Sequence, residues 1–150
     1  MKKNGLKKFI CIVPDASLKA KQWPLKKFDE LIKSLQRSHS KYKIVLLGSD
    51  RNKMEWLKNN NADVIVPEEL LDLRVTSILF KKSRLVITHD GGPMHLAWAN
   101  RAKLIALMPK YLNLNYYKPL GKEITILSEN IKNLESGKVA NYADKILRSA

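Results

Sequence analysis

The chain has 150 residues, 45% of them apolar and 28% charged, a length and balance that favour one folded domain over a disordered chain. No apolar run approaches the roughly 20 residues that cross a bilayer, and the apolar stretch after the basic start ends at Pro14, too soon for a secretion signal. The single cysteine, Cys11, lies in an apolar run and has no partner for an intrachain disulfide. These features predict a buried, unreactive thiol and a cytoplasmic protein.

The formal net charge of +14 is unevenly distributed along the chain. Residues 1–43 contain 12 Lys and Arg against 3 Asp and Glu. Such a surface attracts polyanions, including nucleic acid, anionic lipid headgroups and a phosphorylated lipid acceptor. Solvated lysines on exposed helix faces explain the same count, so charge alone identifies no partner.

Short apolar, β-branched runs alternate with stretches of helical period along the chain. The predicted strands are residues 9–13, 43–47, 63–66, 84–88, 103–107 and 123–127. The first predicted helix begins at Pro24 and carries an apolar stripe that reaches Leu35. The other predicted helices are residues 52–60, 70–82, 92–100 and 137–149. In the third of these helices, Leu73, Ile78 and Leu79 are expected to face the core.

Unbroken apolar strands, each followed by a helix, predict a parallel sheet covered on both faces. The expected fold is therefore a Rossmann-like, doubly wound α/β domain that spans residues 1–150. In such sheets ligands bind at the carboxyl ends of the strands, so function is expected in the loops after strands one, two, four and five. The irregular stretch 108–121 is the long connection in this pattern, and loops of that length are often functional.

The loop after the fourth predicted strand, His89 to His95, turns directly into a helix. Gly91 and Gly92 allow the backbone to approach a ligand, and Pro93 suits the first helical turn, where its missing N–H is not needed. The N–H groups of that turn, with the helix dipole behind them, form an anion site suited to a phosphate. The alternative is a plain turn in which Asp90 caps the helix.

Two further loops at the same edge of the sheet carry polar candidates. After strand one, Ser17 can donate its hydroxyl to a phosphate oxygen, and Lys21 supplies a positive charge. Trp23, just before Pro24, is expected to pack against the helix start rather than stack on a base. After strand two, Asp50 could accept hydrogen bonds from ribose hydroxyls or could cap the next helix.

Several chemistries lack support in the sequence. The histidines have no nearby thiols that would complete a metal site, and no glycine-rich loop ends in Lys-Ser or Lys-Thr as in P-loop hydrolases. A nucleophile elbow is also missing. Aromatic residues are not interleaved with the basic stretch as they are in single-strand-binding platforms.

Two of these loops together resemble glycosyltransferase family 9, the ADP-heptose:lipopolysaccharide heptosyltransferases. The resemblance is carried by Pro-Asp-Ala-Ser at 14–17, Lys-Gln-Trp-Pro at 21–24 and Thr-His-Asp-Gly-Gly-Pro-Met-His-Leu-Ala at 88–97. It covers nearly the whole chain. It implies the C-terminal, donor-binding half of a GT-B glycosyltransferase, in which a nucleotide-sugar, with ADP-heptose as the family's donor, is used to glycosylate a lipopolysaccharide core or related glycan.

The resemblance also implies roles for individual residues. Lys21 and Ser17 would contact the donor diphosphate, and the amides of Gly91 and Gly92 would hold it at the helix start. Asp90 would order this loop or touch the sugar, with His95 supporting it. No metal or other cofactor is expected, because lysine and helix amides supply the positive charge.

The sequence departs from the family pattern at three places. Asp15 replaces a usual Gly, Gly91 replaces Ser or Thr, and Ala-Leu-Met-Pro at 106–109 stands where Phe-Gly is common. The acceptor-binding domain, which carries the family's general base, is not in this sequence, so no catalytic base is expected here and activity would need a separate acceptor domain. A lipid-linked acceptor would place the protein at the inner face of the plasma membrane.

Two other interpretations remain open from the residues. The chain could be a nucleotide or nucleotide-sugar binding module without turnover. It could also be a basic domain that binds nucleic acid through residues 1–43.

Overall fold

The computed structural model describes residues 8–109 and 124–149. The strands are β1 (Phe9–Val13), β2 (Lys43–Leu46), β3 (Val64–Ile65), β4 (Leu85–His89), β5 (Leu104–Pro109) and β6 (Ile124–Glu129). The helices are α1 (Leu25–Ser38), α2 (Arg51–Asn60), α3 (Leu73–Lys82), α4 (Gly92–Ala99) and α6 (Ser136–Arg148), with a short 3-10 helix η1 (Lys19–Lys21). Most of the predicted stretch 108–121 lies outside the described residues.

The strands form one sheet in the order β3-β2-β1-β4-β5-β6, and every neighbouring pair is parallel. This confirms the predicted doubly wound α/β fold. The chain runs outward from β1 to β3 and then returns to β4 on the other side of β1. The reversal opens a crevice at the carboxyl ends of β1 and β4, where open α/β sheets bind their ligands.

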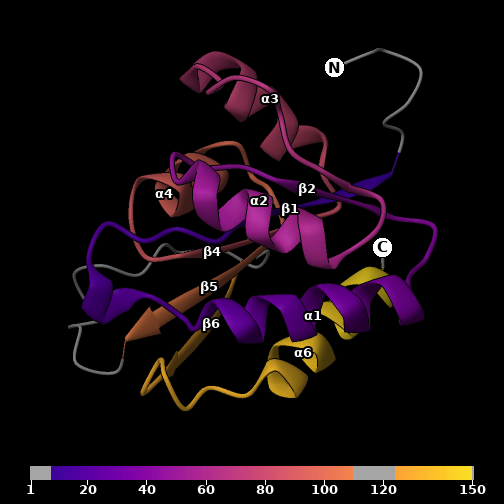
Figure 1. Ribbon diagram of the computed structural model, residues 1–150, viewed down its shortest axis with the longest axis vertical. Coiled ribbons are helices and arrows are strands. Elements are labelled where there is room, and N and C mark those ends of the chain that lie inside the picture. The colour runs from indigo at the N-terminus through magenta and orange to yellow at the C-terminus, as the bar shows by residue number, and fades with distance from the viewer. Residues whose placement is uncertain (1–7, 110–123, 150) are drawn as a thin grey trace.

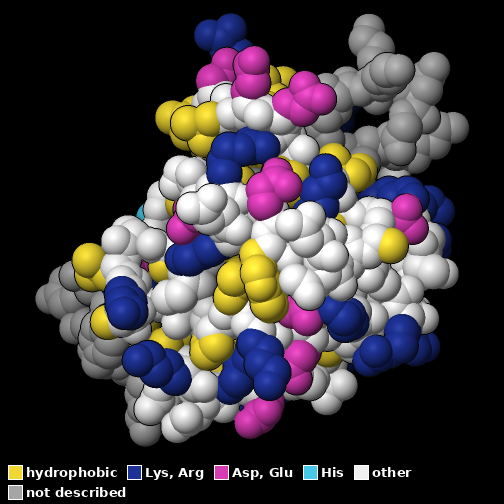
Figure 2. All heavy atoms as spheres, in the orientation of Figure 1, with side chains coloured by type: hydrophobic (Ala, Val, Ile, Leu, Met, Phe, Trp, Pro, Cys, Tyr) yellow, Lys and Arg dark blue, Asp and Glu magenta, His cyan; other side chains and the backbone are white. Residues whose placement is uncertain are grey.

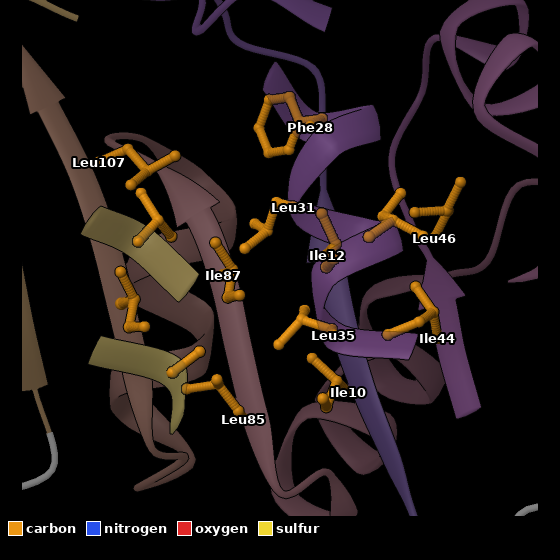
Figure 3. Packing of buried hydrophobic residues seen from close by; sticks show 14 of the residues in the cluster. Ile10, Ile12, Phe28, Leu31, Leu35, Ile44, Leu46, Leu85, Ile87 and Leu107 are labelled. Carbon is orange, nitrogen blue, oxygen red and sulfur yellow. The ribbon is translucent and has the colours of Figure 1, made fainter. Parts of the chain in front are cut away.

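Two apolar cores lie on opposite faces of the sheet. On one face, α1, α2 and α6 pack against alternate strand residues such as Ile10, Ile12 and Ile87. Figure 3 shows this packing, with Leu31 and Leu35 of α1 pointing at the strands. On the other face, α3 and α4 cover the intervening residues, including Cys11 and Val86. Figure 1 shows α1 and α6 side by side, well separated from α3 and α4.

Three details differ from the sequence-based prediction. Pro24 is the residue before α1 rather than its first helical residue, because its ψ of 135° is extended. Helix α3 begins at Leu73, where the Asp72 carboxylate accepts a hydrogen bond from the N–H of Val75 at 2.9 Å. Leu73 and Ile78 are 75% and 50% exposed, so of the three predicted core residues of this helix only Leu79 is buried.

Burial of Cys11 follows from its place in the central strand β1. Its side chain is fully buried, and burial raises the pKa of the thiol to about 12, against a smaller lowering by a hydrogen bond to Ser83. The thiol is therefore protonated at neutral pH, as expected for a packing residue.

The basic side chains of the described residues do not gather into one patch on the face drawn in Figure 2. Lys and Arg are spread over that face with Asp and Glu between them. Within residues 8–109 and 124–149, no helix is both long and apolar enough to cross a membrane.

Candidate functional site

A large cavity, about 1400 Å³, opens at the carboxyl ends of the strands. Its lining residues come from four connections, within the ranges 13–17 after β1, 47–51 after β2, 67–74 around the start of α3 and 88–96 around the start of α4. The site expected from the topology therefore exists as a hollow in the structure. Its walls combine polar loops with the apolar side chains that precede α3.

The β4–α4 connection has a backbone that only glycine adopts readily. Gly91 has φ 140° and ψ −163°, and Gly92 follows as the first residue of α4. A Ser or Thr at position 91 would be strained in this conformation. Pro93 lies in the first turn, whose N–H groups have no acceptor within the helix. This turn faces the cavity and can bind an anion.

Lys21 and Asp90 form an ion pair beside this turn. The Lys21 Nζ donates to Asp90 Oδ2 at 2.8 Å, and the two side chains are only 16% and 5% exposed. The pair joins η1 to the end of β4, across 69 residues of sequence. A positive charge is thus held next to the α4 start by a carboxylate that follows β4 directly.

His89 connects β4 to both ends of the β1–α1 connection. Its Nε2 accepts a hydrogen bond from the backbone N–H of Trp23 at 2.9 Å, and its Nδ1 lies 3.2 Å from the carbonyl oxygen of Asp15. A backbone N–H only donates and a carbonyl only accepts, so Nδ1 carries the hydrogen and the ring is neutral. Burial, more than any other cause, lowers the pKa of His89 to about 4.

A second bridge runs from the β1–α1 connection to α2. The side-chain amide of Gln22 donates to the carbonyl oxygen of Pro14 at 2.8 Å and accepts from Lys53 Nζ at 2.9 Å. Trp23 is fully buried and donates its indole N–H to the carbonyl oxygen of Leu134, which confirms that this residue packs rather than stacks on a base.

Asp15 reaches from this connection to the one after β2. Its Oδ2 accepts from the N–H and the hydroxyl of Ser49 at 3.3 and 3.1 Å. The carboxylate lies directly against Gly48, whose φ is +145°, so a Cβ at position 48 would collide with it. The Asp15 carboxylate that departs from the family pattern thus faces the β2–α2 connection, where it bonds Ser49, rather than the α4 start.

The structure brings most of the sequence-predicted residues together. Ser17, Asp90, Gly91, Gly92 and His95 line the cavity. Lys21 is absent from the lining but contacts it through Asp90. Asp50 lies outside the lining.

Asp50 acts as the N-cap of α2. Its carboxylate accepts from the backbone N–H of Lys53 at 3.2 Å and lies 3.7 Å from that lysine's Nζ. Asp50 does not line the cavity, although its neighbours Ser49 and Arg51 do. Of the two roles that the sequence left open, the capping role is the one that the geometry supports.

Sequence reasoning missed the apolar wall and the two residues that fasten the loops. Leu70 and Leu73 line the cavity while 73% and 75% exposed, whereas helical periodicity had placed Leu73 in the core. Asp15 and His89 gave no signal of their contacts, because each bonds a partner distant in sequence. Among the described residues, no group of three or more His, Cys, Asp or Glu side chains could hold a metal ion.

These features define a class of protein: a Rossmann-like α/β domain with a cavity at its switch point suited to a phosphorylated ligand. The particular family follows from the sequence itself. Residues 1–146 match the profile of glycosyltransferase family 9 (heptosyltransferase), and the chain belongs to this family. No curated protein is similar enough to the chain to count as a match.

Solved structures of family members have the same fold. The chain resembles the Escherichia coli heptosyltransferase WaaC with ADP (18% identity, TM-score 0.84), covering 97% of this chain and 46% of that one. It resembles E. coli ADP-heptose LPS heptosyltransferase II (21%, 0.84), covering 97% and 48%, and the family 9 glycosyl transferase of Veillonella parvula (17%, 0.78), covering 100% and 48%. The chain thus spans about half the length of these relatives. The likeness confirms the GT-B type of α/β fold.

Proposed function

We propose that this chain binds the diphosphate of a nucleotide-sugar and serves as the donor-binding half of a heptosyltransferase-like glycosyltransferase. The observation that carries the proposal is that the start of α4 opens on the cavity and that Asp90, directly before it, holds the Lys21 ammonium group beside it. A diphosphate spanning these elements would receive N–H donors from the helix and positive charge from the lysine.

Ser17 and the apolar wall complete the proposed binding mode. The Ser17 side chain lines the cavity on the same loop as Lys21 and can donate to a phosphate oxygen. Leu70 and Leu73 offer an apolar surface on which a planar base would bury area. A relative, WaaC, was solved with ADP, and another structure of it holds ADP-2-deoxy-2-fluoro heptose. ADP-heptose is accordingly the donor we propose.

The remaining partners of the reaction are part of the same proposal. The acceptor would be a lipopolysaccharide core or a related lipid-linked glycan, reached at the inner face of the plasma membrane. The acceptor-binding domain, with the general base, would be a separate part of the enzyme. The Lys21 charge would stabilise the departing nucleoside diphosphate, in place of a metal ion.

Calorimetric titration of the full chain with ADP, UDP and an RNA oligomer tests donor binding. We expect saturable binding of a nucleoside diphosphate that is lost in Lys21→Met. Lys43→Met is a matched control, since it removes the same charge from an exposed residue at the amino end of β2. RNA binding that falls steeply with salt and ignores Lys21 would instead indicate a nucleic-acid-binding domain.

A transfer assay tests turnover separately. The chain is mixed with the acceptor-binding domain of a family 9 enzyme, a lipid acceptor and labelled nucleotide-sugars. We expect sugar transfer that depends on both parts. If nucleotides bind but no donor is turned over, the chain is a binding module without catalysis.

A further inference from the structure

The β1–α1 connection carries Ser17 and Lys21, but it contains little regular structure of its own. Between β1 and α1 only the three residues of η1 are helical, and Ser17 and Leu18 are exposed. A loop of this kind needs attachment points, meaning hydrogen bonds to a rigid element, if its polar groups are to face a ligand in one geometry. Three of the described contacts that fix it come from the end of β4.

The buried side chain of His89 supplies two of these attachment points. The ring is 1% exposed, lies on the same face of β4 as Leu85 and Ile87, and meets the Phe28 ring edge-on at 5.3 Å. From there it bonds Asp15 at one end of the connection and Trp23 at the other. Ser17 and Lys21 both lie between these two attachment points.

The residue after His89 supplies the third point. Asp90 holds the ammonium group of Lys21, so two consecutive residues of β4 and its extension fasten the backbone and the charged side chain of one loop. The same β4 end leads directly into Gly91 and the start of α4. Any shift of the β1–α1 connection relative to the α4 start must therefore break bonds to His89 or Asp90.

We propose that His89 is a positioning residue of the diphosphate site, which as the neutral Nδ1–H tautomer fixes the Ser17–Lys21 segment against the start of α4. The proposal rests on the proposed function for its ligand, while the loop contacts stand on the geometry alone. His89 itself is buried behind the loop and acts through Ser17 and Lys21 rather than on the ligand.

Three substitutions separate the two bonds of the ring. His89→Gln places an amide oxygen near the Nε2 position and can keep the bond from Trp23. His89→Asn places an amide N–H near the Nδ1 position and can keep the bond to Asp15. His89→Leu fills similar space and removes both bonds. Leu85→Ala, on the same strand and face, is the control for a general loss of stability.

The first measurement needs no ligand. Amide hydrogen exchange of residues 16–22 should quicken in His89→Leu relative to the rest of the sheet, less so in His89→Gln and His89→Asn, and not selectively in Leu85→Ala. Nitrogen NMR of the wild-type ring should show the Nδ1–H tautomer. Unchanged loop exchange in His89→Leu, or the Nε2–H tautomer in the wild type, would overturn the proposal.

The second measurement is ADP affinity by calorimetry. The dissociation constant should rise roughly tenfold or more in His89→Leu, since a buried hydrogen bond left unmade weakens the state that needs it by about that factor. The Gln and Asn variants should fall between His89→Leu and the wild type, and Leu85→Ala should bind as the wild type does. Wild-type affinity in His89→Leu overturns the positioning role. If the wild type itself binds no nucleotide, the proposed function fails, and hydrogen exchange still decides whether His89 orders the loop.

Discussion

The two walls of the cavity are built in opposite ways. The polar wall contains Asp15 and Ser17 of the β1–α1 connection, and this connection is held in place by bonds to His89, Asp90 and Lys53. The wall formed by residues 67–73 is largely apolar, and its leucines Leu70 and Leu73 are about three-quarters exposed. In the polar wall, hydrogen bonds from residues distant in sequence fix the conformation of the loop. In the apolar wall, the leucine side chains are exposed to solvent and available to a ligand.

This difference matches the demands of a two-part ligand. A diphosphate is recognised by directional donors and charge, which act well only when their positions are fixed. A base or other flat apolar group gains free energy from area removed from water, which tolerates variation in geometry. The polar wall should therefore respond sharply to substitution in both stability and binding, and the apolar wall in binding alone.

The largest effect is expected from breaking the ion pair on the polar wall. Lys21→Met leaves the Asp90 carboxylate almost buried without its partner, which should lower the free energy of unfolding by about 3 kcal/mol. Adding Asp90→Asn removes the unpaired charge and should restore much of that loss, while nucleotide binding stays absent. Chemical denaturation and calorimetry on the two variants measure both quantities. A double variant no more stable than Lys21→Met would show that the pair has no such role.

Next in size is the pH dependence of stability that His89 imposes. As pH falls below 6.5, the unfolded chain takes up a proton on this histidine while the folded protein does not until about pH 4. The stability contributed by the neutral ring is thus complete above pH 6.5 and lost progressively toward pH 4, by about 3 kcal/mol in all. The free energy of unfolding of the wild type should therefore fall relative to that of His89→Leu as the pH is lowered from 6.5 to 4, as chemical denaturation across this window can measure. A difference in the free energy of unfolding that stays constant with pH would contradict this role of His89.

A smaller effect is expected where the polar wall meets the β2–α2 connection. Gly48→Ala should lower stability by about 1–3 kcal/mol, because φ +145° disfavours any side chain and the new methyl group collides with Asp15. In the background of Asp15→Gly the collision disappears and only the backbone strain remains. Thermal unfolding of the four members of this cycle measures the coupling. Additive effects would mean that Asp15 does not occupy the space above Gly48.

The smallest effect on stability belongs to the apolar wall. Leu70→Ser and Leu73→Ser should each change the free energy of unfolding by no more than about 0.5 kcal/mol, since both side chains are exposed. Affinity for ADP should nevertheless fall several-fold, whereas affinity for inorganic pyrophosphate should not change. Ile78→Ser is the matched control, because Ile78 is exposed on α3, as Leu73 is, but lies outside the cavity lining. Equal losses for ADP and pyrophosphate would contradict a base-binding role for this wall.

Much of the fold could be predicted because its determinants are local. Alternating apolar runs and helical stretches predicted every strand and every α-helix of the described residues to within a few positions, but not the short η1. The largest discrepancies lie between β2 and α3. Strand β3 is two residues long, and α3 starts three residues after its predicted start because Asp72 caps it. A capping carboxylate and an edge strand depend on neighbours that periodicity does not represent.

In the candidate site, too, the features set by local sequence could be predicted and the others could not. The His-Asp-Gly-Gly-Pro segment and its helix start were readable because glycine, proline and a helix N-terminus act within a few residues. Ser17 and Lys21 could be placed at the same edge of the sheet from topology alone. The assignment of Asp50 to ribose could not be decided, since a carboxylate before a helix suits capping equally well.

The sequence by itself determined the order of strands and helices, the glycine turn before α4 and the family to which the chain belongs. Only the tertiary structure decided that His89 is neutral and fastens two loop ends, that Lys21 is held by Asp90, and that Leu73 lines a cavity instead of the core. The physical reason is range. Backbone preferences and periodicity act between near neighbours, whereas these contacts join residues as many as 74 positions apart and exist only once the parallel sheet has brought its carboxyl ends together.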